Sequence, residues 1–268
     1  MSREEPSSLR RLSDAECRHY RDELRAGRYA ALADAEGFDR ICFALEALGL
    51  RLLGKQGDLG QYEDRIGCYA RSSPVLNELA ETHPAGFKPF GALYETVRKA
   101  RNDNMHLGAY ARHATSAAIE LCIGLEEALM VDVEPTVGHV MVKSPISVEP
   151  WQPVAHARQL MLMHSFSFLP VRHQQRWYLL SELALAQFLN ANQRERKTRL
   201  GLAIADAVEH APGLVLMPVP PERLLTAQAT IDEVLCRARV IDGPTLWLVV
   251  DIGREDHLAG VLSPFELM

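Results

Sequence analysis

Apolar residues recur at helical spacing in the first half of the chain. After Gly37, four of them follow one another at steps of four, three and four, which places them on one face of a helix: Ile41, Leu45, Leu48 and Leu52. Upstream, 13-SDAE-16 has the form of a capping box, in which Ser13 and Glu16 bind each other's backbone amides. It predicts the start of a helix that runs towards Leu32.

A helical hairpin is predicted after 83-HPAGFKP-89. Its first helix has an apolar inner face formed by Phe90, Leu93, Val97 and Ala100. Its second helix is longer and has apolar residues at alternating steps of four and three: Leu107, Ala111, Ala114, Ala118, Leu121, Leu125 and Ala128. This seven-residue rhythm suits packing against another helix at a shallow angle, and the alanines allow a close approach.

The segment between these helices is less regular. Gly54, Gly57 and Gly60 are expected to break the chain, because glycine interrupts regular structure. A shorter helical region is expected over residues 61–82, interrupted by Pro74. The periodic segments together favour a helical bundle over residues 1–131.

The pattern changes at 131-VDVEPTVGHVM-141. Prolines and glycines become frequent, and β-branched runs appear at 146-ISV-148 and 248-LVV-250. Short strands alternating with helices are typical of α/β or α+β domains. We therefore predict a two-domain α + α/β protein with a boundary near residue 132, the second domain covering residues 132–268.

The second half contains an internal duplication. Residues 140–171 are predicted to form a short strand, a turn, a helix and a second strand, and residues 223–250 follow the same order with Thr230 as the helix cap. Each copy continues with one more strand that leads into a helix. The two repeats cover about 137–191 and 213–268.

The phrases VMVKSPISVEPWQPV, FSFLPV and GVLSPFEL carry a resemblance to a tandem pair of cystathionine-β-synthase (CBS) domains over residues 137–268. The resemblance implies a sensor of an adenosine nucleotide (AMP, ADP or ATP). In this family a G-h-h-[ST]-x-x-[DN] segment, with h apolar, joins the last strand to its helix and binds phosphate and ribose.

The second repeat retains Gly260 and Ser263 of that motif, with Glu266 in place of the usual aspartate. The resemblance also implies an adenine cleft that uses the strand starting at Ile146 and the edge around Pro170. The first repeat departs further, with Tyr178 for the glycine, Ser181 retained and Ala184 for the acid. At most one competent nucleotide site is expected; the alternative is that both clefts are vestigial and the pair only dimerises.

Charge and cysteine content narrow the functional classes. The net charge of −6 argues against a general DNA-coating protein. Five scattered cysteines without a C-x-x-C pair indicate neither a zinc site nor a disulfide framework, so reduced thiols in the cytoplasm are expected. The N-terminus does not resemble a signal peptide, and no apolar run approaches the roughly 20 residues of a membrane span.

The stretch 98-RKARNDNMHLGAY-110 is the most polar part of the predicted hairpin. Asn102, His106, Tyr110 and His113 would share one face of a single helix. Arg101 would reach His106 only if that helix began near Asn102 or if a second subunit contributed. A neutral imidazole can take a proton from an RNA 2′-hydroxyl, and an arginine fork can stabilise the charge on the phosphoryl oxygens.

The run Arg101-Asn102-Asp103-Asn104-Met105-His106 resembles the R-[polar]-x-x-x-H motif of the HEPN superfamily, many of whose members are dimeric ribonucleases. That resemblance implies Arg101 and His106 as catalytic residues and Asn102 as a supporting polar group. It further implies a cyclic phosphate product. Because no H-E-x-x-H motif, carboxylate cluster or P-loop occurs, no metal is expected.

The sequence thus predicts a cytoplasmic homodimer that cleaves RNA under the control of an adenosine nucleotide. The alternative is a non-catalytic sensor whose helical domain serves for dimerisation or partner docking. Between the repeats, a basic run at residues 194–199 is expected to be a solvated helix end, or else a site of phosphate attraction.

Overall fold

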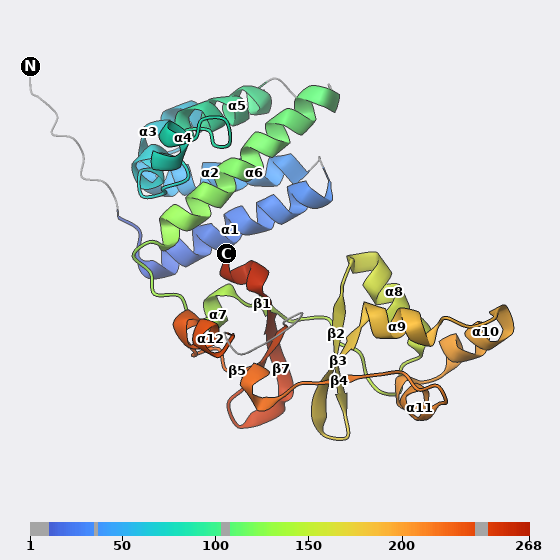
Figure 1. Cartoon of the computed structure of the whole chain (residues 1–268). Coiled ribbons are helices and arrows are strands. Elements are labelled where there is room, and N and C mark those ends of the chain that lie inside the picture. Colours follow the sequence, from blue (N-terminus) through green and yellow to red (C-terminus); the bar gives the residue numbers. More distant parts are fainter. Residues whose placement is uncertain (1–10, 35–36, 103–107, 239–245) are drawn as a thin grey trace, which may run out of the picture. The chain divides into compact units, whose positions relative to one another are not determined.

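The computed structural model describes residues 11–34, 37–102, 108–238 and 246–268, with the backbone alone at 108–111. The chain divides into a helical unit, Met1–Glu134, and a C-terminal unit of mixed helices and strands, Pro135–Met268 (Figure 1). Each unit has its own hydrophobic core or cores. Within the described parts of the chain, no helix is long and apolar enough to cross a membrane.

The helices of the helical unit are α1 (Asp14–Ala33), α2 (Phe38–Leu53), α3 (Leu59–Ala70), α4 (Glu78–Thr82), α5 (Phe90–Asn102) and α6 (Gly108–Met130). Helix α6 packs along α1 and α5, and α2 packs on α1 and α3 (Figure 1). The predicted inner face of α2 is confirmed, since Ile41, Leu45 and Leu48 are fully buried. The predicted break at Gly60 is wrong, because this residue lies in the first turn of α3.

The predicted start of α1 is confirmed in atomic detail. The Ser13 hydroxyl accepts from the Glu16 amide at 3.4 Å, and the Glu16 carboxylate accepts from the Ser13 amide at 2.9 Å. At the far end of α2, Gly54 has a φ of 76°, a left-handed conformation that glycine adopts without steric cost. Local sequence therefore sets both of these helix ends.

Glu16 also receives a charged hydrogen bond from Arg51 of α2, with Nε and Oε1 2.6 Å apart. That bond, aided by the Ser13 bonds, lowers the Glu16 pKa from 4.5 to about 2. A depressed carboxylate pKa stabilises the fold above the unfolded-state pKa, and this contribution is lost as the pH falls towards 2.

The difference in urea midpoint between wild type and Glu16→Gln should therefore be largest at neutral pH and shrink in acid. A difference that stays constant down to pH 2 would contradict this linkage.

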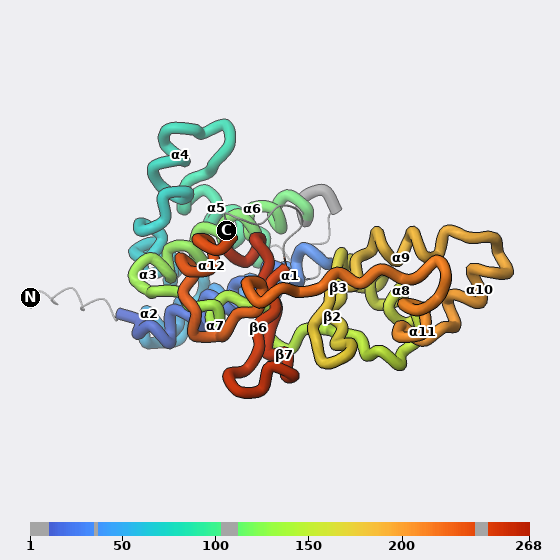
Figure 2. The backbone as a smooth tube through the Cα atoms, turned by 60° about the horizontal axis from the view of Figure 1, so that its bottom comes forward, coloured from blue at the N-terminus to red at the C-terminus, as the bar shows by residue number. Residues whose placement is uncertain are grey.

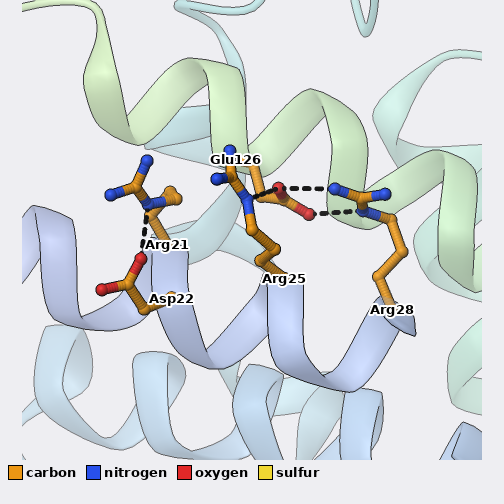
Figure 3. Close-up of polar contacts among 5 residues, drawn as sticks. All are labelled: Arg21, Asp22, Arg25, Arg28 and Glu126. Carbon is orange, nitrogen blue, oxygen red and sulfur yellow. Dashed lines mark hydrogen bonds and ion pairs between the residues drawn. The ribbon is translucent and has the colours of Figure 1, made fainter. Parts of the chain in front are cut away.

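A buried ionic cluster joins α1 to α6 (Figure 3). Arg28 donates to both carboxylate oxygens of Glu126, at 2.8 and 3.0 Å, and Arg25 donates to the same group at 3.1 Å. Arg28 and Glu126 are buried, and Arg21, one turn before Arg25, is buried as well and pairs with Asp22 at 2.8 Å. One carboxylate of α6 thus binds two guanidinium groups of α1.

Two sheets organise the C-terminal unit. The four-stranded sheet has the order β1-β7-β6-β5 and the three-stranded sheet the order β2-β3-β4. Their strands are β1 (Val142–Lys143), β2 (Phe168–His173), β3 (Arg176–Ser181), β4 (Met217–Pro218), β5 (Leu224–Leu225), β6 (Trp247–Asp251) and β7 (Arg254–Leu262). The helices are α7 (Val137–Val140), α8 (Val154–His164), α9 (Glu182–Phe188), α10 (Gln193–Gly201), α11 (Ile204–Glu209), α12 (Ile231–Ala238), η2 (Pro221–Arg223) and η3 (Pro264–Leu267). Helices α8 to α11 group on one side of the unit (Figure 2).

The repeats exchange their first segments. Strand β1 lies at the start of the first repeat but pairs with β7 of the second, with Val142 opposite Val261. Strand β4 lies at the start of the second repeat but pairs with β3 of the first, with Met217 opposite Leu179. Helix α7 directly precedes β1 in the chain, and its Val137 lies in the core of the second repeat. Each repeat therefore completes the other, and the two form one unit.

The predicted order of elements within each repeat is confirmed, with two local differences. The strand expected at 146-ISV-148 is a single parallel bridge between Val148 and Val171. The last helix, expected to be short, is the single 3-10 turn η3. Thr230 caps α12 as predicted, since its hydroxyl accepts from the Glu233 amide at 3.3 Å.

Candidate functional site

The polar stretch 98–110 spans the end of one helix and the start of the next. Arg101 and Asn102 are the last residues of α5, and α6 begins at Gly108. Since α5 and α6 pack side by side (Figure 1), Asn102 does not share a helix face with Tyr110 or His113, and that expectation is wrong. The predicted base, His106, lies outside the described residues.

Arg101 is held against α2. Its Nε lies 3.4 Å from Glu46 Oε1 and its Nη1 3.8 Å from Asp39 Oδ1. The guanidinium carbon lies 5.4 Å from the centre of the Phe43 ring, within cation–π distance. The Arg101 side chain is 33 % exposed, so it remains open to a ligand, but two carboxylates offset its charge.

One neighbouring cation is also engaged with an acid. Lys99 pairs with Glu95 one turn earlier on α5, at 2.8 Å, while Arg112 and His113 are exposed at the start of α6. The local attraction for a phosphate backbone therefore depends on few cations.

In the second repeat, Ser263 and Glu266 bind each other at the start of η3. Glu266 Oε2 lies 2.6 Å from the Ser263 hydroxyl and 2.7 Å from the Ser263 amide. Gly260 lies against the Met141 side chain, where an added Cβ would be 2.5 Å from the sulfur. In this structure the glycine allows β1 to pair with β7, and the serine and glutamate form a capping box.

The first repeat has the same cap without the glycine or the acid. The Ser181 hydroxyl accepts from the Ala184 amide at 3.1 Å at the start of α9. Tyr178, at the glycine position, pairs with Val171 on one side and Pro218 on the other. The two strand ends are therefore alike in their serine caps only.

The remaining predicted ligand residues belong to the three-stranded sheet. Pro170 lies in β2, and its carbonyl accepts from the Val148 amide at 2.9 Å, which brings the segment after Ile146 alongside β2. Ile146 is 37 % exposed. The structure thus brings Ile146 near Pro170, and Gly260 near Ser263 and Glu266, as two groups on two sheets.

Sequence reasoning missed an open groove of about 1050 Å³ formed by α8, α9 and the start of α10. Leu162 and Leu183 line it and are 65 and 64 % exposed, and Arg158 and Glu182 lie among them. Leucines on two short helices were the signal for this groove in the sequence, but only the fold shows that the two helices lie next to each other.

The basic run between the repeats is only partly a solvated helix end. Arg194, Arg196 and Lys197 are exposed on α10. Arg199 is instead buried: it donates to the Phe188 carbonyl at 2.5 Å and pairs with Glu195. One of the four cations therefore stabilises the packing of α10 on α9.

No family model and no curated protein matches this chain. Several solved structures of CBS-domain proteins match about half of it. CBSX2 in complex with AMP is 19% identical over 50% of this chain and 92% of its own, with a TM-score of 0.36. A CBS-domain protein from Agrobacterium tumefaciens is 13% identical over 51% and 93%, with a TM-score of 0.36.

The CBS domain pair of protein MJ0100, in complex with 5-methylthioadenosine and S-adenosyl-L-methionine, is 12% identical over 50% of this chain and 93% of its own, with a TM-score of 0.35. All three TM-scores are below 0.5 and all identities are below 25%.

Proposed function

We propose that this chain is a metal-independent endoribonuclease regulated by an adenosine nucleotide. The C-terminal unit would bind the nucleotide and the helical unit would cut RNA. The observation that carries the proposal is the exchange of first segments between the repeats. It makes the pair one unit, so a ligand bound at one repeat would contact elements of both, as a regulatory domain requires.

For the nucleotide, the strand end at Gly260 and Ser263 is the favoured site. Ser263 and Glu266 would bind phosphate and ribose only by giving up or sharing the bonds they now make with each other. Ile146 and Pro170, the residues expected to contact the base, belong to the other sheet, so they would belong to a second cleft rather than to this site. We therefore expect a single, weak adenosine site in the second repeat.

For RNA cleavage, His106 would take the proton of a 2′-hydroxyl, and the resulting alkoxide would attack the adjacent phosphorus. The 5′-oxygen would leave with a proton, which yields a 2′,3′-cyclic phosphate. Arg101 would stabilise the charge on the phosphoryl oxygens, and Asn102 would position the phosphate. The partial exposure of Arg101 at the end of α5 supports this role.

The test is an assay of the purified full chain on mixed cellular RNA in the presence of EDTA, alone and with AMP, ADP or ATP. EDTA-resistant cleavage that changes with nucleotide is expected. No cleavage in any nucleotide state would overturn the nuclease. A thermal-shift series with the same nucleotides tests the sensor separately, since a ligand that binds the native state raises the melting temperature.

A second candidate is a non-catalytic sensor whose helical unit serves for dimerisation or docking. The specific observation that favours it is the pairing of Arg101 with Asp39 and Glu46, because two carboxylates repel a phosphate backbone. Nucleotide-dependent melting without RNA cleavage would support this candidate.

We also propose a homodimer through the α8–α9 groove. A two-fold axis would bring Leu162 and Leu183 of each subunit together and place Arg158 opposite Glu182 of the partner subunit, so that each charge pair forms twice. Leu183→Glu is expected to convert the dimer to a monomer in light scattering. Ile252→Glu, which changes a 72 % exposed residue outside the groove, should leave it dimeric. A Leu183→Glu protein that remains a dimer would rule out this face.

A further inference from the structure

One face of α2 is built to hold a cation. Asp39, Phe43 and Glu46 are spaced four and three residues apart, so they lie in a row along the helix. Phe43 is 55 % exposed and Asp39 is 62 % exposed, so neither is explained by core packing. Two carboxylates around an exposed aromatic ring form a niche that suits a guanidinium group.

Arg101 occupies this niche from the end of α5. It contacts all three residues: Glu46 at 3.4 Å, Asp39 at 3.8 Å and the Phe43 ring at 5.4 Å. Among described groups, these are the charged and aromatic partners that the structure gives to the guanidinium. The arginine proposed to bind RNA is therefore already bound to another part of the same chain.

We propose that Asp39, Phe43 and Glu46 form a latch that holds the Arg101 side chain on α2, and that single-stranded RNA binds by displacing the two carboxylates from it. This inference rests on the proposed RNA-cleaving function and deepens it. In the latched state, Phe43 keeps the planar guanidinium in place while the carboxylates offset its charge. A phosphate offers two oxygens to the same fork of donors and replaces both acids.

The contacts are weak enough for such an exchange. Both ion pairs are longer than 3.3 Å, and Asp39, Glu46 and Arg101 are between 33 and 62 % exposed. Exposed ion pairs of this kind contribute little to stability. A phosphate backbone, which carries concentrated negative charge, competes effectively with them.

The test measures binding of a fluorescein-labelled oligouridylate by anisotropy. All proteins carry His106→Ala, so that the RNA is not cut. Asp39→Asn/Glu46→Gln is expected to bind about threefold to tenfold more tightly. Adding Arg101→Ala should remove that gain, because the latch acts only through this arginine.

The matched control is Asp64→Asn/Glu81→Gln, which removes the same number of negative charges from exposed positions of α3 and α4. If the latch variant binds no more tightly than this control while Arg101→Ala weakens binding, the latch is wrong and the proposed RNA function stands. If Arg101→Ala leaves binding unchanged, or no protein binds RNA, the proposed RNA function fails and the latch fails with it.

Discussion

Glu126→Gln is expected to lower the free energy of unfolding of the helical unit by about 3 to 5 kcal/mol. The substitution keeps the size of the side chain but removes the negative charge that Arg25 and Arg28 share (Figure 3). Breaking a buried ion pair from one side is costly because the remaining charge stays buried without compensation. Urea unfolding followed by circular dichroism measures the loss.

Glu23→Gln is the matched control, since Glu23 is exposed on α1, and its effect should stay within about 0.5 kcal/mol. The double variant Glu126→Gln/Arg28→Gln should lose less than the sum of the single losses, because contacting residues couple. A Glu126→Gln protein as stable as the control would show that the cluster contributes nothing to the fold.

His106→Ala is expected to reduce the rate of RNA cleavage by about 10²- to 10⁴-fold, the usual contribution of a general base. Cleavage of mixed cellular RNA in EDTA measures it, with the cyclic phosphate product identified by mass spectrometry. The change concerns proton transfer, so RNA affinity should be nearly unchanged.

His113→Ala is the matched control, because His113 is an exposed histidine at the start of α6, where no catalytic role is proposed. The cleavage rate of Arg101→Lys should lie between those of His106→Ala and His113→Ala, since lysine keeps the charge but lacks the two-pronged donor geometry. Cleavage at the wild-type rate in His106→Ala would show that the proposed base is wrong.

Helix boundaries were predictable where a few adjacent residues decide them. The 13-SDAE-16 capping box and the apolar face of α2 follow from interactions within one or two turns. The position of Gly60 was not predictable in this way. The Asp58 side chain caps α3 by accepting from the Gln61 amide at 2.9 Å, and this outweighs the cost of a glycine in the first turn.

The candidate site was predictable in its residues but not in its surroundings. Arg101 and Asn102 stand out in sequence as polar residues in an apolar hairpin. The partners of Arg101 lie on α2, and Glu46 is 55 positions earlier in the chain. Nothing in the spacing of the hairpin indicates those acids, although in the proposed latch they would keep the arginine from a phosphate.

Ser263 and Glu266 illustrate the same division. Their spacing predicts a motif at the end of a strand, and the structure places them there. The S-x-x-E spacing fits both the ligand motif and a capping box, and the structure shows the serine and the acid bound to each other.

By itself, the sequence determined the helical first half, its capped helix α1, and the order of strands and helices in two repeats. These features depend on periodicity and on residues close together in the chain. Only the tertiary structure decided that the repeats exchange their first segments, that Glu126 joins α1 to α6, and that Arg101 is held by α2. Each of these rests on contacts between residues far apart in sequence, whose pairing is set by how the elements pack.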